Sequence, residues 1–281
     1  MTQDKAAPAA TNEPPSRNLL MRVIAALVLA PVAIAIAYAG GFLWILLVTL
    51  AAIGLYVEWL AVIGAGHRLR VIVAGVLALA AAGLCLGAGR LDASLLVLAI
   101  GLIAIAVISP EQRQWTIAGF CYAAVAEIAS VLLRQDSEGF VALMFVLLVV
   151  WATDSSGYFA GRGIGGPKLW PRVSPKKTWA GAVGSLVGSL IIAAGFAVFG
   201  LGPVAPLLVL GAALSVVSQF GDLFESAVKR RFGVKDSSHL IPGHGGLMDR
   251  LDGFVAAVAV AAIFGFLRGG ADGVGRGLMV W

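Results

Sequence analysis

The chain has 281 residues, of which 60% are hydrophobic and only 12% are charged, and its formal net charge is +5. Soluble domains are about one-quarter charged, so this composition excludes a soluble globular protein. Several apolar runs reach the ~20 residues that a helix needs to cross about 30 Å of hydrocarbon. We therefore expect an all-α, polytopic integral membrane protein.

Nine apolar runs make up most of the sequence. Residues 1–16 precede them, contain few large apolar side chains and are predicted to form a disordered N-terminal tail. The candidate spans are 19–38, 42–63, 71–89, 91–108, 115–133, 139–160, 179–201, 204–225 and 251–267. Because runs 71–89 and 91–108 are barely separated, we expect eight or nine transmembrane helices. The GSLVG run at 184–188 also matches the small-residue pattern of close helix packing.

Basic residues concentrate in two segments, 162–177 and 229–235, which hold nine of the 20 Lys and Arg residues. Cytoplasmic loops carry the excess of such residues. An N-terminus on the inside puts both segments on the cytoplasmic side and leaves few basic residues outside. Topology alone accounts for this charge, which would also attract anionic lipid.

Acidic residues stand at the ends of the apolar runs beside these basic segments: Asp154, Asp222, Glu225, Asp249 and Asp252. Ionisable groups at a membrane edge are costly, which makes them candidates for function. Asp249 and Asp252 are three residues apart and share one helical face, while Asp222 lies at the same expected membrane level. Carboxylates beside basic side chains are suited to a polyphosphate bound with Mg²⁺.

The segment 241–246, IPGHGG, links the second basic segment to the last span. Its glycines would let backbone N–H groups approach a phosphate closely. An ordinary turn before the last helix has the same composition. A lone histidine such as His244 is also more often structural than functional.

The polar residues of this C-terminal region follow the pattern S-x-x-K-R-x4-K-D…P-x-H-G-G-x-x-D-R-x-D, which starts at Ser226 and ends at Asp252. The pattern resembles the signature of the phosphatidate cytidylyltransferase family, also called CDP-diacylglycerol synthases. The SPKKT run at 174–178 adds to the resemblance, which covers roughly residues 150–255. The family usually has an acidic residue shortly after that run, whereas this sequence has Ala180.

The resemblance implies transfer of the cytidylyl group of CTP to phosphatidate, giving CDP-diacylglycerol and pyrophosphate in phospholipid biosynthesis. Mg²⁺ is the implied cofactor, with a second metal ion possible. Membrane lipid is a further partner, a homodimer is compatible with the sequence, and no nucleic acid is expected. The implied location is the cell (cytoplasmic) membrane, with the active site facing the cytoplasm.

Site residues are assigned from the same resemblance. The expected metal ligands are Asp222, Asp249 and Asp252. The expected catalytic residues are Asp222, Asp249, Lys229, Arg230 and Arg250. The expected substrate-binding residues are Ser174, Lys176, Lys177, Thr178, Lys235, His244, Gly245 and Gly246. Residues 17–138 are then N-terminal transmembrane helices, 139–268 a catalytic transmembrane region with two cytoplasmic loops, and 269–281 a C-terminal tail.

Two alternatives belong to other classes, and a third is a more closely related enzyme. An ion-coupled transporter could use membrane acids, but its site should lie near the bilayer midplane in broken, repeated helices. A membrane-anchored binder of anionic lipid would explain the basic loops and leave the acids unused. A CDP-alcohol phosphotransferase also clusters aspartates, but its D-G-x2-A-R…G-x3-D-x3-D pattern is missing here.

Overall fold

A computed structural model of the chain describes residues 28–238 and 245–281, and within these ranges eight helices are long and apolar enough to cross a membrane. They are α2 (Gly41–Val62), α3 (Leu69–Gly87), α4 (Leu91–Ile108), α5 (Arg113–Arg134), α6 (Gly139–Gly163), α7 (Trp179–Val198), α8 (Val204–Arg231) and α9 (Met248–Gly269). The expectation of an all-α polytopic membrane protein is confirmed. Eight of the nine predicted spans correspond to these helices.

The first predicted span, 19–38, lies partly outside the described residues. Its described part is a shorter apolar helix, Val28–Ala39, which precedes α2. The predicted tail, 1–16, lies wholly outside them. The doubtful boundary between the third and fourth spans is resolved as a tight turn, because α3 ends at Gly87 and α4 begins at Leu91.

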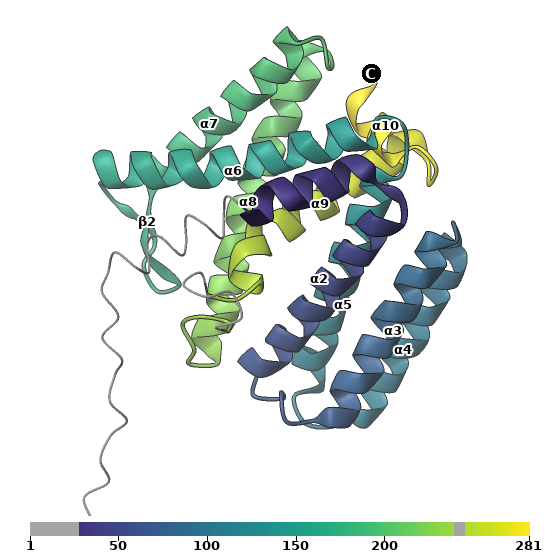
Figure 1. The fold of residues 1–281 in the computed structure, drawn as a ribbon. Coiled ribbons are helices and arrows are strands. Elements are labelled where there is room, and N and C mark those ends of the chain that lie inside the picture. Colours follow the sequence, from purple (N-terminus) through teal and green to yellow (C-terminus); the bar gives the residue numbers. More distant parts are fainter. Residues whose placement is uncertain (1–27, 239–244) are drawn as a thin grey trace, which may run out of the picture.

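Helices α2 to α5 form an N-terminal bundle in which α3 and α4 lie side by side and α2 and α5 face the rest of the molecule (Figure 1). Tyr56, Trp59 and Phe120 are buried at its centre. Small residues let these rings pack closely: a Cβ atom at Gly119 would lie only 2.2 Å from the Trp59 ring. The bundle is therefore tightly packed around aromatic side chains.

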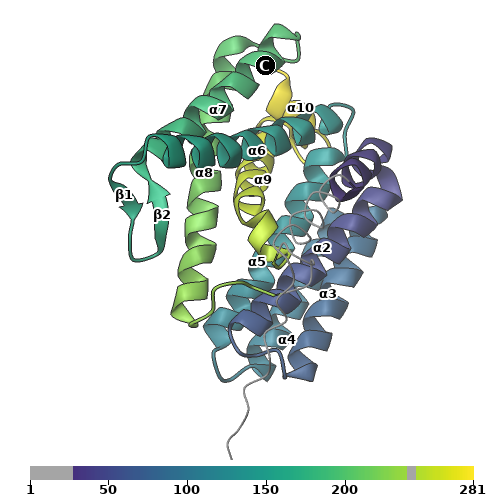
Figure 2. The same ribbon diagram turned by 60° about the vertical axis from the view of Figure 1, so that its left-hand side comes forward.

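Helix α6 crosses the direction of α8 and packs along α7, as both views show (Figure 2). The predicted small-residue contact lies in this pair. A Cβ atom at Gly184 would lie 2.3 Å from the Ala160 Cβ, and one at Gly188 would lie 2.1 Å from the Ser156 Oγ. The GSLVG run thus lies at a contact between helices, where its glycines let α7 approach α6 closely.

A short antiparallel hairpin connects α6 to α7. It consists of β1 (Lys168–Trp170) and β2 (Ser174–Thr178), with Lys168 paired to Thr178 and Trp170 paired to Ser174. The SPKKT run is strand β2. A strand of five residues is too short to alter the helical class of the fold, but it fixes the direction of the lysine side chains.

The C-terminal residues pack against the helices. A short helix, α10 (Val274–Met279), contacts α6 and α9, and the Arg268 guanidinium lies 3.9 Å from the centre of the Trp281 ring. Both apolar cores contain residues from before and after position 138. The division of the chain at that position therefore stays a prediction.

Candidate active site

A cavity of about 850 Å³ opens between the C-terminal halves of α6 and α8 and the N-terminal halves of α7 and α9. Residues of the hairpin form one of its walls. The charged residues that line it are Asp154, Arg162, Lys168, Lys176, Lys177, Asp222, Asp249, Arg250 and Asp252. Five basic and four acidic side chains thus share one cavity at the ends of membrane helices.

The hairpin is joined to α8 by an ion pair. Lys177 Nζ lies 2.5 Å from Asp222 Oδ2, and the Ser226 hydroxyl donates to Asp222 Oδ1 at 3.3 Å. The lysine comes from one basic segment and the aspartate from the helix that leads to the other. The two regions that the sequence marks as polar therefore meet in one site.

Asp249, in the first turn of α9, accepts hydrogen bonds at both carboxylate oxygens. Lys229 Nζ lies 2.5 Å from Oδ1, and Oδ2 accepts from the Ser237 and Gly246 backbone N–H groups at 3.0 Å. The Ser237 hydroxyl also donates to Oδ2, at 3.1 Å. In this conformation Asp249 holds the segment that precedes α9 against the end of α8.

A fifth carboxyl group, that of Glu225, lies close to the cavity but outside its lining, on the side of Asp252. Glu225 and Asp252 are near enough for their charges to interact, and Lys229 Nζ is 3.2 Å from Glu225 Oε1. Two carboxylates repel each other unless a proton or a cation compensates their charge. Lys229 supplies such a positive charge on the Glu225 side.

Thr178 lies at the junction of the hairpin and α7. Its side chain caps the helix by accepting from the Gly181 N–H at 3.1 Å, and it also lines the cavity. Capping satisfies one of the free N–H groups at a helix start. Thr178 therefore fixes the end of the lysine-bearing strand relative to α7.

The predicted site residues divide into three groups. Those that line the cavity are Lys176, Lys177, Thr178, Asp222, Asp249, Arg250 and Asp252. Those described outside its lining are Ser174, Lys229, Arg230, Lys235, Gly245 and Gly246. His244 lies outside the described residues.

Of the residues outside the lining, Lys229 acts on the site through Asp249, and the two glycines pack beside that aspartate. Gly245 has a φ of 85°, and a Cβ atom there would lie 2.9 Å from Asp249 Oδ2. A Cβ atom at Gly246 would lie 1.9 Å from the Ser237 Oγ. The lack of room for a side chain therefore accounts for glycine at both positions, and no bound ligand is needed to explain them.

Ala180, which stands where the resemblance leads one to expect an acid, is in the first turn of α7 and outside the cavity lining. The four acids that do line the cavity come from α6, α8 and α9. The absence of a carboxylate at position 180 therefore removes none of the four acidic residues that line the cavity.

One residue that contacts the site region escaped the sequence analysis. Glu58, in α2, is 5% exposed and accepts from Leu247 N–H and Met248 N–H, both at 2.8 Å. The signal was present, because Glu58 is an ionisable residue inside the apolar run 42–63. Its distance in sequence from the C-terminal pattern concealed the contact.

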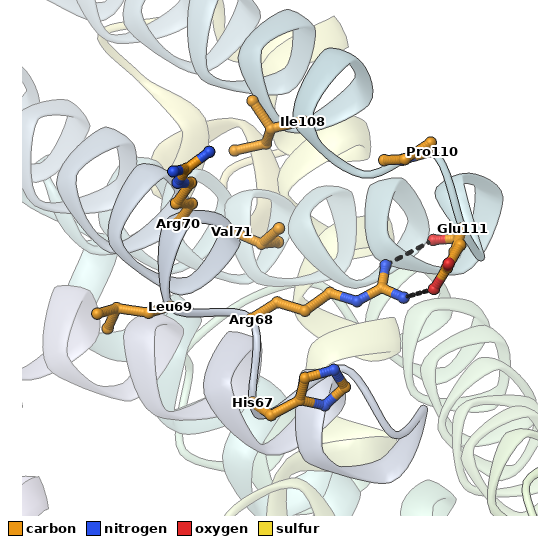
Figure 3. A pocket seen from close by; sticks show the side chains of 8 residues that line it. All are labelled: His67, Arg68, Leu69, Arg70, Val71, Ile108, Pro110 and Glu111. Carbon is orange, nitrogen blue, oxygen red and sulfur yellow. Dashed lines mark hydrogen bonds and ion pairs between the residues drawn. The ribbon is translucent and has the colours of Figure 1, made fainter.

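A second hollow, of about 570 Å³, lies between the α2–α3 and α4–α5 connections. Arg68 closes one side by pairing with the Glu111 carboxylate and donating to its backbone oxygen at 3.0 Å (Figure 3). His67 and Arg70 also line it. No acid of the larger cavity takes part, so the two hollows are separate.

The residues present can be compared with the needs of a magnesium ion. Within the described ranges no group of three or more His, Cys, Asp or Glu side chains is arranged to hold a metal by itself. Mg²⁺, however, commonly uses one or two carboxylates together with water and substrate phosphates. Asp222 and Asp252 face the same cavity, and both offer the carboxylate oxygens that Mg²⁺ prefers. The donor set therefore fits a magnesium ion completed by phosphate oxygens.

The fold and the cavity together define a class: a polytopic helical membrane protein with cationic and acidic side chains gathered where four helices end. Comparison with known proteins makes this specific. The profile of the cytidylyltransferase family matches residues 20–267. This chain belongs to the cytidylyltransferase family.

Individual relatives agree with the family match. A phosphatidate cytidylyltransferase of Brucella abortus (strain 2308) is 40% identical over 261 residues, which cover 88% of this chain and 93% of the relative. A phosphatidate cytidylyltransferase of Staphylococcus saprophyticus is 41% identical over 167 residues, 58% of this chain and 64% of the relative. One of Bacillus subtilis is 41% identical over 139 residues, 49% of this chain and 50% of the relative.

Proposed function

We propose that this protein transfers the cytidylyl group of CTP to phosphatidate, giving CDP-diacylglycerol and pyrophosphate. The observation that carries the proposal is the cavity at the helix ends, where five basic side chains stand beside four carboxylates. Similarity to proteins named phosphatidate cytidylyltransferase supports the choice of substrates. The apolar helices would keep the lipid substrate's acyl chains in the membrane beside the cavity.

In the proposed reaction a phosphate oxygen of phosphatidate attacks the α-phosphorus of CTP. A new P–O bond forms, the bond between the α-phosphorus and the bridging oxygen breaks, and pyrophosphate leaves with that electron pair. Phosphatidate already carries a negative oxygen, so little general-base assistance is needed. Catalysis then depends on alignment and on stabilising negative charge.

The basic residues are assigned to that charge. Lys176 and Lys177 reach the cavity from the hairpin and Arg250 reaches it from α9, so phosphates could be held from two sides. Arg162 and Lys168 extend the same cationic wall. Lys229 would act from behind the lining, by holding Asp249.

Asp222 and Asp252 are the proposed carboxylate ligands of Mg²⁺, and Asp249 stays a predicted ligand that would share its oxygens with Lys229 and Ser237. When bound, the ion would neutralise phosphate charge and orient the triphosphate. Lys177 would then exchange its contact with Asp222 for a phosphate oxygen.

We further propose that the protein resides in the cytoplasmic membrane with this cavity facing the cytoplasm. The concentration of basic residues in the hairpin and at the end of α8 supports that orientation. A homodimer stays a prediction.

Pyrophosphate release from CTP, measured with the purified protein in detergent micelles, tests the proposal. It should require both phosphatidate and Mg²⁺ and stop when EDTA is added. Diacylglycerol, which lacks the phosphate nucleophile, should not replace phosphatidate. Pyrophosphate release that is independent of phosphatidate would contradict the proposal.

A further inference from the structure

We propose that Glu58, in the N-terminal bundle, is a positioning residue for the site, holding the first turn of α9 and the segment before it. This inference rests on the proposed cytidylyl transfer for its kinetic consequence. The sequence assigned the N-terminal helices no role beyond burying lipid-facing surface. Glu58 connects them to the cavity.

The first support is the number of donors that meet this single side chain. Glu58 is 5% exposed in an apolar helix. Its Oε1 accepts from the Ser238 hydroxyl at 2.6 Å and the Leu247 N–H at 2.8 Å. Its Oε2 accepts from the Ser237 hydroxyl at 3.0 Å and the Met248 N–H at 2.8 Å. A buried carboxylate is costly unless hydrogen bonds compensate, and here both oxygens are used.

The second support is the way α9 begins. Its N-cap residue is Leu247, which makes no side-chain cap, so the first N–H groups need acceptors from elsewhere. Glu58 supplies them at Leu247 and Met248, and its negative charge is favourable at a helix N-terminus. The same first turn and a half carries Asp249, Arg250 and Asp252, all of which line the cavity.

The third support is a shared hydroxyl. The Ser237 Oγ lies 3.0 Å from Glu58 Oε2 and 3.1 Å from Asp249 Oδ2. A serine hydroxyl has one proton to donate, so it is shared between the two carboxylates. Asp249 in turn binds Lys229 at 2.5 Å. A continuous chain of contacts thus links α2 to the charged end of α8.

Packing restricts the same junction. A Cβ atom at Gly54 would lie 2.9 Å from Leu247 Cδ2, and one at Gly246 would lie 2.6 Å from Glu58 Oε2. Helix α2 therefore meets the start of α9 with little free space. Replacing one Glu58 carboxylate oxygen by an NH₂ group would leave either the Leu247 or the Met248 N–H without its acceptor.

Glu127 provides a matched control in the same bundle. It is 0% exposed in α5, and its Oε1 accepts from the Thr49 hydroxyl at 2.7 Å. Neither residue lines the cavity. Glu58 and Glu127 are thus both buried acids of membrane helices, and only the first contacts α9 among the hydrogen bonds of the described residues.

The test compares Glu58→Gln, Ser237→Ala and Glu127→Gln with the unaltered protein. A displacement of about 1 Å can cost ~10²-fold in rate. We expect Glu58→Gln to lower kcat by about that factor, because one amide oxygen cannot serve donors on both sides. Ser237→Ala removes only the hydroxyl shared between Glu58 and Asp249 and leaves the Glu58 contacts with Leu247 and Met248 in place, so it should lower kcat less. The double variant should resemble Glu58→Gln alone, since coupled residues are not additive.

Amide hydrogen exchange at Leu247 and Met248 gives a readout that does not depend on activity. It should accelerate in Glu58→Gln and stay unchanged in Glu127→Gln, whose kcat per folded molecule should also be preserved. Unaltered exchange, or a Glu58→Gln kcat equal to that of the unaltered protein, would overturn the inference. If the unaltered protein forms no CDP-diacylglycerol, the proposed function fails, and the exchange comparison still decides the role of Glu58.

Discussion

Lys177 Nζ lies 2.5 Å from Asp222 Oδ2, and this contact joins the hairpin to α8 across the cavity. Forty-five positions separate the two residues in sequence. In the proposed complex the lysine would contact a phosphate and the aspartate would contact the cation that accompanies it. The ion pair therefore holds both groups in place before the substrate arrives.

Lys177→Met should lower kcat/KM for CTP by about 10²-fold, the effect typical of removing one donor to developing negative charge. The apolar chain keeps most of the side-chain volume but cannot neutralise phosphate. Steady-state release of pyrophosphate measures the effect. Arg172→Met is the matched control, because Arg172 is exposed in the same hairpin and outside the cavity lining. Equal activity of the two variants would argue against a role for Lys177.

Asp222→Asn should reduce turnover by at least ~10²-fold, since the amide keeps the size of the carboxylate and loses the charge that holds Mg²⁺. Thermal stability should change little, because the side chain is partly exposed. Titration of Mg²⁺ in the activity assay provides the measurement. Full activity at the magnesium concentration that saturates the unaltered protein would refute the proposed ligation.

Asp249→Asn should lower turnover and also stability. Its carboxylate accepts from Lys229, Ser237 and Gly246, and leaving buried donors unsatisfied costs about 1–3 kcal/mol. The melting temperature in micelles should fall, in contrast to Asp222→Asn. Asp92→Asn is the control, because Asp92 is exposed and pairs with Arg90. Identical melting temperatures for the Asp249 and Asp92 variants would contradict the anchoring role.

Gly246→Ala should reduce the free energy of unfolding by about 1–3 kcal/mol, the usual cost of overpacking. The new Cβ atom would meet the Ser237 Oγ at 1.9 Å and Glu58 Oε2 at 2.6 Å. Gly195→Ala should be neutral or stabilising by comparison, because a Cβ atom there meets nothing within 4 Å. Unfolding by denaturant measures both. A Gly246 variant as stable as the Gly195 variant would show that the junction can relax.

Hydropathy predicted the spans because helix length and lipid thickness are linked directly. The acids Asp222, Asp249 and Asp252 were identified because charge at a membrane edge is rare. Their convergence in one cavity was predicted only from their common membrane level. Sequence pattern does not say which helices are neighbours, so the contact of Glu58 with the start of α9 could not be predicted.

The hairpin shows a second limit. The SPKKT run was predicted as a loop that contacts phosphate, and nothing in it indicated a strand paired with 168–170. Pairing depends on the partner that the fold brings alongside. At position 180 the sequence departs from the family pattern, and only the structure shows that this residue lies outside the cavity lining.

The transfer of label from CTP tests the central claim most directly. Purified protein, phosphatidate and Mg²⁺ are incubated with CTP labelled at the α-phosphorus or, separately, at the γ-phosphorus. The account predicts that the α-label appears in the lipid fraction as CDP-diacylglycerol while the γ-label appears only in pyrophosphate. Label from the γ-position in the lipid, or no α-label in the lipid, would contradict it.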